Sequence, residues 1–340
     1  MARLVLRDIP MSDTNPHDSL VRNVLSSLEN AEGELRAVLP QALCDAIDWR
    51  TLRLENSHFV DSNLKDFESD LLFTAKLREL DVVLYVLFEH QSTNDGLMAY
   101  RVLCYMVKIW DWWLKNNNGA EKLPPIVPVV MSHAIGGWTA PTSMHQVIAA
   151  PEELLAVLKP YLPDFMFVLD DLMQHTDAEL TARTMLDVGK LALLLLRHGR
   201  GQRNLLEVAR EWAGLFRAVW NTPNGARTLR MLVRYMSLVK RGTTMQDMER
   251  LLDDMLGAHA HEVIMVPFEQ DMLNAETKGK NKGEATGRAA AVLAFALARG
   301  LRVTDEARQR ILACTDIPTL DRWIVRAATA TAIESVFNDA

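Results

Sequence analysis

The feature that most constrains the fold of this chain is an apolar run that ends in polar residues. Residues 82–88 (VVLYVLF) are seven apolar residues of strand-forming types, which predicts a strand buried on both faces of a sheet. Glu89, His90 and Gln91 follow directly. A carboxylate at the end of an interior strand is costly unless a charged group meets it, so Glu89 is the first candidate functional residue.

The neighbouring segments predict an α/β core around this strand. Residues 70–76 (DLLFTAK) predict a strand that a turn at residues 78–81 joins to the buried one, and residues 126–131 predict a third strand. A helix is expected at about residues 97–114, before the breaker NNNG at residues 116–119. The order helix, hairpin, helix, strand indicates an α/β domain with a mixed central sheet flanked by helices.

Helices are expected on both sides of this core. Asn15 predicts an N-cap, Pro16 suits the first helical position, and Asp18 favours the positive end of the helix dipole. A second amphipathic helix is expected near residues 33–46, and after Pro151 the patterns are almost wholly helical. Near the C-terminus, Thr304 and Asp316 (or its neighbour Thr315) predict helix starts. The predicted domains are 13–200 (α/β domain), 201–276 (basic helical extension) and 277–340 (connector and small helical C-terminal unit).

Composition excludes several classes of protein. Hydrophobic residues make up 49% and charged residues 24%, a balance typical of a packed globular core. The N-terminus lacks the pattern of a secretion signal, and no charge-free apolar run approaches the roughly 18 residues of a membrane span. The three scattered cysteines argue against a disulfide framework and a zinc site. We therefore expect a soluble cytoplasmic protein with no membrane partner.

The net charge of -7 is unevenly distributed along the chain. Between Leu196 and Arg250, eleven Arg or Lys residues stand against four acidic ones, so this stretch is strongly basic. It could form one basic face for nucleic acid on an otherwise acidic molecule, and it includes Arg227, Arg230 and Arg234. Arginines on solvated helix faces explain the same pattern without a ligand.

The residues at the strand end point to phosphate chemistry. Side chains alternate along a strand, so Glu89 and Gln91 share one face and His90 points away. In an antiparallel hairpin, Asp70 at the start of one strand would lie beside Glu89 at the end of the next. Two carboxylates repel unless a cation bridges them, and oxygen ligands suit Mg²⁺ or Mn²⁺. Such a site activates a water for attack on a phosphate, and Gln91 can orient that water.

The layout D…ExQ on a hairpin is that of PD-(D/E)XK nucleases, with Gln91 in the place of the usual Lys. By spacing alone it is a weak motif, because Asp70 could be a loop carboxylate and Glu89 could pair with Arg101. Arg101 and Tyr105 share one face of the predicted helix. There Arg101 could hold a phosphate bidentately or form an ion pair with Glu89 or a neighbouring acid.

Other candidates have simpler structural interpretations. Asp18 could be an active-site acid on the first helix, but a role at the helix N-terminus explains it more simply. The backbone carbonyl of His90 could bind the metal while its imidazole packs structurally, and His17 and His133 also look structural. The aromatic residues Trp110, Trp112 and Trp113 could stack on bases, although core or interface packing explains their spacing better.

Several strings of this sequence, taken in order, resemble the Rpn family of bacterial recombination-promoting nucleases, which is related to YhgA-like transposase proteins. The strings lie along nearly the whole chain, and EHQS with its flanks is the most specific. They are PHD (16–18), LP (39–40), SHFVD (57–61), SDLLF (69–73), YVLFEHQS (85–92), MAYRVLCYM (98–106), LPPIVPVV (123–130), GW (137–138), GEATGRAAA (283–291) and DRWIVRAATATAIESVF (321–337).

The resemblance implies a PD-(D/E)XK endonuclease core and metal-dependent cleavage of double-stranded DNA. It implies a role in recombination or horizontal gene transfer, with links to phage defence, and a location at the nucleoid. Asp70 and Glu89 match the family's metal-binding acids, and Gln91 matches its Gln. The expected cofactor is Mg²⁺, with Mn²⁺ or Ca²⁺ as substitutes, and a homo-oligomer is compatible with the sequence. The connector before the last helices is shorter and less repetitive than is typical of the family, which leaves its regulatory role open.

Two other functions compete with this one. A catalytically weak DNA-binding or regulatory protein that keeps the nuclease fold is conceivable, because the usual Lys is absent. A true transposase would need an RNase H-like acidic triad, which the hairpin layout does not match.

Overall fold

A computed structural model of the chain divides into two compact units, Met1–Val263 and Ile264–Ala340. The structure describes residues 15–55, 71–78, 83–201, 204–239, 244–260 and 263 in the first unit, and residues 288–293, 296, 299, 301, 303–314, 316–330 and 332–337 in the second. The helices described between residues 204 and 260 belong to the same unit as the sheet. The predicted domain boundaries at residues 200 and 276 stay predictions.

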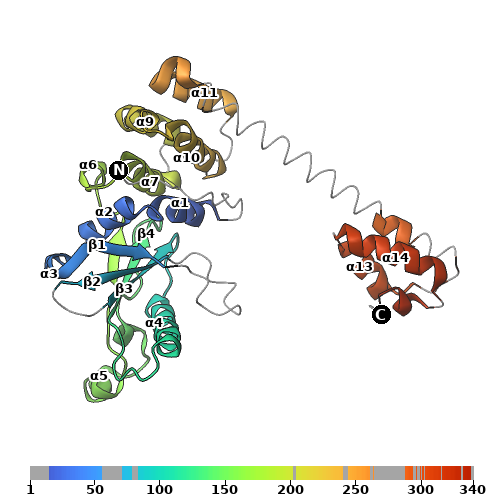
Figure 1. Ribbon diagram of the computed structural model, residues 1–340, viewed down its shortest axis with the longest axis horizontal. Coiled ribbons are helices and arrows are strands. Elements are labelled where there is room, and N and C mark those ends of the chain that lie inside the picture. The colour runs from blue at the N-terminus through green and yellow to red at the C-terminus, as the bar shows by residue number, and fades with distance from the viewer. Residues whose placement is uncertain are drawn as a thin grey trace. The chain divides into compact units, whose positions relative to one another are not determined.

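A five-stranded mixed sheet forms the centre of the first unit (Figure 1). Its strands lie side by side in chain order: β1 (Ile47–Leu54), β2 (Leu71–Leu77), β3 (Val83–Gln91), β4 (Ile126–Ser132) and β5 (Val168–Asp171). Strands β1, β2 and β3 pair antiparallel, whereas β3, β4 and β5 pair parallel. The predicted α/β class with a mixed sheet is therefore confirmed.

The interior position of β3 is also confirmed. Each side chain from Leu84 to Phe88 is 6% exposed or less, so the strand is covered on both faces. The sequence analysis missed β1 and β5. In β1 the buried residues Ile47, Trp49 and Leu52 are interspersed with charged ones rather than forming an apolar run, and β5 is only four residues long.

The helices of the first unit lie on both faces of the sheet. They are α1 (Pro16–Leu25), α2 (Leu28–Val38), α3 (Gln41–Ala46), α4 (Met98–Asn116), α5 (Glu152–Leu158), α6 (Asp177–Ala182), α7 (Asp187–Gly199), α8 (Leu205–Arg210), α9 (Ala213–Trp220), α10 (Gly225–Val239) and α11 (Met245–Leu256), with 3₁₀ turns η2 (Met144–Val147), η3 (Lys159–Tyr161) and η4 (Gly257–His259). Helices α1, α7, α9 and α10 pack together on one side of the sheet, and α4 covers the other (Figure 1).

The N-terminal helices agree with the sequence at α1 and differ after it. The Asn15 side chain accepts a hydrogen bond from the Asp18 backbone N–H, as expected of an N-cap. The single helix predicted near residues 33–46 is wrong, because two helices, α2 and α3, cover this segment. Pro40 disfavours the helical conformation of the residue before it, and Leu39 is extended with ψ 148°.

Arg183, the C-cap residue of α6, joins α2 to β5 through buried ionic contacts. Nη1 of Arg183 lies 2.7 Å from Glu34 Oε2, and Nη2 lies 2.8 Å from Asp170 Oδ1. All three side chains are buried, and the guanidinium contacts both acidic groups where water is excluded. This contact holds the first helices against the far edge of the sheet.

The second unit is a small helical bundle. Its described elements include α13 (Asp305–Ala313), α14 (Ile317–Thr329) and the 3₁₀ turn η5 (Ile333–Val336), which share a core with Val292 and Ala296. Thr304 and Asp316 cap α13 and α14 through their side chains, so both predicted helix starts are confirmed. Most of the predicted connector, residues 277–287, lies outside the described residues.

Candidate active site

Glu89 lies at the carboxyl end of β3 and is almost completely buried, with 1% of its side chain exposed. Strand alternation places it on the face of β3 that carries Tyr85 and Leu87, and that face packs against α4. The expectation that a charged group meets this carboxylate is confirmed. Nη2 of Arg101, from α4, lies 3.4 Å from Glu89 Oε1.

Arg101 is held by three side chains. Its Nη1 donates to Asp95 Oδ2 at 2.8 Å, and its Nη2 donates to the Tyr105 hydroxyl at 3.2 Å in addition to its longer contact with Glu89. Burial would lower the pKa of Arg101, but the hydrogen bonds with Tyr105 and Asp95 and the charge of Glu89 raise it above its usual value. The structure thus shows the ion-pair alternative for Arg101, while its contact with a phosphate stays a prediction.

The hairpin that the prediction for Asp70 required is present. Strands β2 and β3 are antiparallel, with Leu71 opposite Phe88, the residue before Glu89. Asp70 itself lies outside the described residues, so its convergence with Glu89 stays a prediction.

Gln91 begins a polar row across the carboxyl ends of three parallel strands. Gln91 of β3 pairs with Ser132 of β4, and Ser132 pairs with Asp171 of β5. Residues paired in neighbouring strands point to the same face, so these side chains share the face of Glu89. The sequence analysis missed Asp171, although VLDD, a carboxylate pair after apolar residues, repeats the signal that identified Glu89.

Asp171 and Asn94 fix the loop that follows β4. Asp171 Oδ2 accepts from the Trp138 backbone N–H at 2.8 Å. Asn94 Oδ1 accepts from the Thr139 N–H at 2.7 Å, and its Nδ2 donates to the Gly137 carbonyl at 3.1 Å. Gly137 has a φ of +86°, a conformation that favours glycine. A fixed loop therefore adjoins the strand ends that carry Gln91 and Ser132.

His90 points to the opposite face of the sheet, as predicted. There its ring stacks on His133 with centroids 4.9 Å apart, and His133 lies 4.6 Å from the ring of His17. Burial, together with the neighbouring histidines and Arg200, lowers the pKa of His17 to about 4 and that of His133 well below its usual value. We call His17, His90 and His133 the histidine cluster. Its members pack structurally, as predicted, but their assembly was not predicted.

The donors around Glu89 are of the kind that Mg²⁺ prefers. Gln91 directs its carbonyl to β4, where it accepts from the His133 backbone N–H at 3.1 Å. Backbone groups of successive strand residues point to opposite neighbours, so the His90 carbonyl is directed to the β2 side. A buried carboxylate and a carbonyl are hard oxygen donors, which fits a Mg²⁺ ligand set. Among the described residues there is no cluster of three or more His, Cys, Asp or Glu side chains able to hold a metal, so the second acidic ligand rests on the prediction for Asp70.

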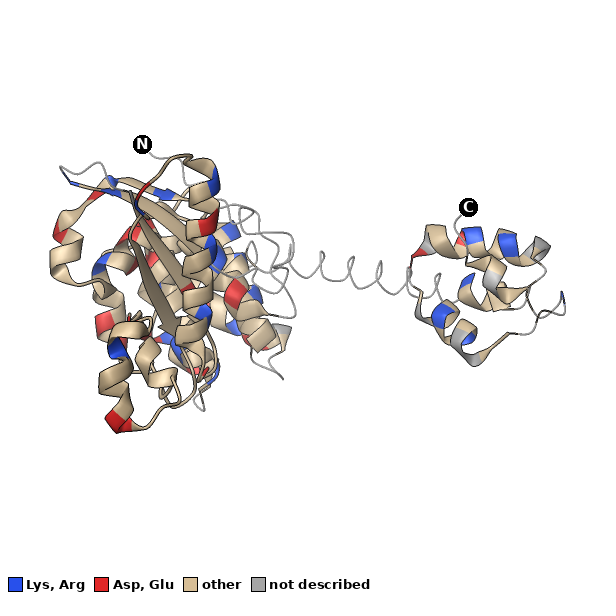
Figure 2. Ribbon diagram, turned by 90° about the horizontal axis from the view of Figure 1, so that it is seen from below, with Lys and Arg blue, Asp and Glu red and all other residues tan. Residues whose placement is uncertain are grey.

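The basic stretch is partly used inside the molecule. Arg197 pairs with Asp177 and also donates to backbone carbonyls, Arg210 pairs with Asp254, and Arg217 donates to the Met255 carbonyl. Acidic and basic positions are interspersed along the first unit (Figure 2). Arg227, Arg230 and Arg234 follow the spacing of one face of α10, and their contact with DNA stays a prediction.

Two other features of this side of the molecule are structural. Trp110, Trp112 and Trp113 pack partly buried against the core under α4, and Trp110 Nε1 donates to the Pro124 carbonyl, which confirms the core interpretation.

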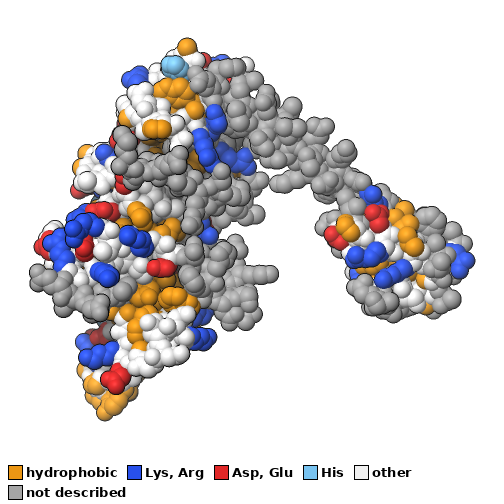
Figure 3. Space-filling view, viewed as in Figure 1, with side chains coloured by type: hydrophobic (Ala, Val, Ile, Leu, Met, Phe, Trp, Pro, Cys, Tyr) orange, Lys and Arg blue, Asp and Glu red, His pale blue; other side chains and the backbone are white. Residues whose placement is uncertain are grey.

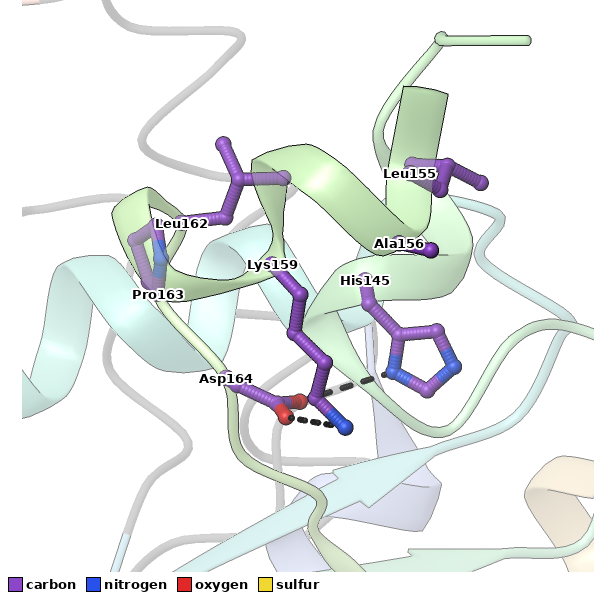
Figure 4. Close-up of a pocket in the computed structure, with 7 residues that line it drawn as sticks. All are labelled: His145, Leu155, Ala156, Lys159, Leu162, Pro163 and Asp164. Atoms are coloured by element: carbon purple, nitrogen blue, oxygen red, sulfur yellow. Dashed lines mark ion pairs between the residues drawn. The ribbon is translucent and has the colours of Figure 1, made fainter. Parts of the chain in front are cut away.

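A cavity of about 150 Å³ lies beside α5 and η3 (Figure 4). His145 and Lys159 both approach Asp164 there, at 3.5 and 3.6 Å. None of the residues around Glu89 lines it.

Comparison with known proteins adds the family. Residues 15–227, more than half of the chain, match the model of the family described as "Putative transposase, YhgA-like". The chain belongs to this family. Among curated relatives of this YhgA-like protein, recombination-promoting nuclease RpnD of Escherichia coli O157:H7 is 32% identical over 35% of the chain and 46% of its own length. Recombination-promoting nuclease RpnA of Escherichia coli K12 is 30% identical over 48% of the chain and 56% of its own length.

The matches also include a relative with a different description. The Escherichia coli K12 protein called "Putative inactive recombination-promoting nuclease-like protein YjiP" is 36% identical over 28% of the chain and 93% of its own length. The YhgA-like chain spans about half the length of RpnD and RpnA. No solved structure gives a significant match. In the described part of the chain, every helix is too short or too polar to span a membrane.

Proposed function

We propose that the protein is a metal-dependent endonuclease of double-stranded DNA with a PD-(D/E)XK core. The observation that carries this proposal is the buried Glu89 carboxylate at the end of β3, on the same face as Gln91 and beside the guanidinium of Arg101. The similarity to relatives named recombination-promoting nucleases supports it at the level of the family. The proposed role is therefore in DNA recombination.

In this proposal each residue has a separate task. Glu89, Asp70 and the His90 carbonyl would hold Mg²⁺, which when bound lowers the pKa of a water and stabilises charge on the phosphate. Gln91 would orient the attacking water by hydrogen bonds. Arg101, with Tyr105 beside it, would donate to the scissile phosphate, since a guanidinium matches phosphate oxygens in geometry and charge.

A second candidate is a nuclease-like protein with weak or no cleavage activity. The Arg101 contact favours it, because a guanidinium beside Glu89 already compensates the buried charge that a metal ion would otherwise neutralise. One related protein, YjiP, is described as a putative inactive member of the nuclease-like proteins. In that case the protein would bind DNA without cutting it.

A plasmid-nicking assay separates the two candidates. Supercoiled DNA is incubated with wild type, Asp70→Ala and Glu89→Gln in Mg²⁺, Mn²⁺ or Ca²⁺, and with chelator. We expect metal-dependent nicking that falls by about 100-fold or more in both variants, because even residues that only support metal ligands contribute about 10- to 100-fold. Glu32→Gln, which changes an exposed carboxylate paired with Arg36, is the matched control and should cleave normally.

The negative results are equally specific. Absence of metal-dependent cleavage by folded wild type, together with retained DNA binding, would establish the second candidate instead. Equal cleavage by Glu89→Gln and wild type would remove Glu89 from the site.

A further inference from the structure

We propose that Asp18 is a positioning residue that holds the end of β3 from the back of the sheet. It would orient the ring of His90 and, through the strand, fix the direction of Glu89 and Gln91. The inference rests on the proposed function for its effect on catalysis, whereas the contact itself does not depend on that function.

The two oxygens of the Asp18 carboxylate have different partners. Oδ1 lies 2.8 Å from His90 Nδ1, and Oδ2 contacts the Nδ2 group of the N-cap residue Asn15. The His90 side chain is 1% exposed and that of Asp18 24%, so water competes weakly for the Asp18–His90 hydrogen bond. One residue of α1 therefore links the start of that helix to the second-last residue of β3.

The ring of His90 is enclosed on the other side by aromatic rings. It stacks on His133 at an interplanar angle of 17°, and the Nδ1 atom of the next ring, His17, lies 2.9 Å from the Tyr235 hydroxyl on α10. Among the described residues, His90 Nε2 has no hydrogen-bond partner. The bond to Asp18, whose carboxylate accepts from Nδ1–H, is then the polar contact that fixes the orientation of the ring.

Main-chain contacts also hold the same strand end. The Gln91 carbonyl accepts from the His133 N–H, and Arg200 donates to the Ser92 carbonyl. Both contacts act on the main chain, whereas the Asp18 contact acts on the His90 ring. Because successive side chains point to opposite faces, a fixed His90 ring behind the sheet sets the direction of Glu89 and Gln91 in front of it.

This geometry differs from that of an acid in the active site itself. Asp18 contacts His90 on the face of β3 that is opposite to Glu89. Asp18 would therefore act through His90, without touching DNA or metal.

The test compares Asp18→Ala, Asp18→Asn and Ser26→Ala in the full-length protein. We measure kcat and KM for DNA cleavage, the melting midpoint, and hydrogen exchange of the peptide that contains residues 89–92. Asp18→Ala should lower kcat about 10- to 100-fold with KM unchanged, and exchange at residues 89–92 should rise. Asp18→Asn should retain most of kcat and of the protection, because its amide oxygen can still accept from His90 Nδ1–H.

Ser26→Ala is the matched control for the stability of α1. It removes the hydrogen bond from the Ser26 hydroxyl to the Arg22 carbonyl at the C-terminus of that helix and should lower the melting midpoint, but it leaves both oxygens of Asp18 with their partners, so kcat and exchange at residues 89–92 should stay at wild-type values. Equal loss of kcat in Ser26→Ala and Asp18→Ala at temperatures where both are folded would overturn the proposal. Equal impairment of Asp18→Asn and Asp18→Ala would overturn it as well.

The failure of the proposed function has a different signature. If folded wild type cleaves no DNA under any metal condition, the proposed function fails, and hydrogen exchange alone decides whether Asp18 anchors the strand end. Unchanged exchange at residues 89–92 in Asp18→Ala rules out the anchor in that case too.

Discussion

The guanidinium of Arg101 lies 3.4 Å from the carboxylate of Glu89, and the two residues come from different layers of the fold. Glu89 ends a strand of the sheet, whereas Arg101 belongs to the first half of α4. The contact places a positive charge beside a buried carboxylate.

Arg101→Ala should lower the free energy of unfolding by about 1–3 kcal/mol in the absence of divalent ions, because it weakens the compensation of a buried charge. Mg²⁺ should then raise the melting midpoint of this variant more than that of wild type, since the cation can replace the lost guanidinium. Arg50→Ala, which removes an exposed ion pair with Asp48, should show neither effect. Equal Mg²⁺ shifts in wild type and Arg101→Ala would argue against a cation at Glu89.

His17 and His133 should make stability depend on pH. The pKa of His17 is lowered to about 4 by burial and by the neighbouring His90 and Arg200, below its ordinary value of 6.5. Between these values the unfolded chain binds the proton and the folded one does not, so stability falls as the pH drops from about 6.5 to 4. The pKa of His133 is shifted in the same direction.

Urea denaturation at pH 7, 5.5 and 4 measures this dependence. His17→Gln should reduce the loss of stability between pH 6.5 and 4 by about 1–3 kcal/mol. His145→Gln is the control, because the side chain of His145 is 55% exposed and lies outside the cluster. Identical pH profiles for wild type and His17→Gln would contradict the prediction.

The basic face of α10 can be tested through the salt dependence of DNA binding. In the triple variant Arg227→Gln, Arg230→Gln, Arg234→Gln, affinity for double-stranded DNA should fall, and the slope of log K against log salt should decrease in magnitude by about 2–3. Arg210→Gln, a change on α8 rather than α10, is the control and should leave the slope unchanged. A triple variant with the wild-type slope would place the DNA surface elsewhere.

Two glycines should respond to alanine in opposite directions. A Cβ at Gly33 on α2 would lie 2.2 Å from the Thr184 carbonyl oxygen, so Gly33→Ala should destabilise the fold by about 1–3 kcal/mol. A Cβ at Gly214 on α9 would meet nothing within 4 Å, so Gly214→Ala should stabilise the helix by about 0.5–1 kcal/mol. Chemical denaturation of both variants measures the difference, and a neutral Gly33→Ala would show that α2 can move away from Thr184.

Exposed apolar side chains on the first unit bear on none of these predictions. Figure 3 shows hydrophobic side chains at the end of the molecule that carries α5, where Val157 and Tyr161 are 65% and 82% exposed. Nothing in the described residues identifies what covers them, so we assign them no role.

The sequence by itself determined the features that depend on neighbouring residues. The apolar run 82–88 predicted an interior strand, and Glu89 directly after it had to meet a charge. Asn15 predicted the start of α1, and the alternation of β3 placed His90 behind the sheet and Gln91 beside Glu89. Each of these patterns spans only a few residues, because side-chain alternation and apolar character are properties of a short stretch of chain.

Tertiary structure alone decided which distant residues meet. Strands β1 and β5 carry too little local signal, and they are recognised by their pairing with β2 and β4. Three such contacts join different elements of the fold. They are the ion pair between Arg101 and Glu89, the polar row from Gln91 to Asp171, and the hydrogen bond between Asp18 and His90. Their energies depend on burial and distance, which exist only once the sheet and helices have packed. The buried position of Glu89 could thus be anticipated from sequence, whereas the choice among its possible partners could not.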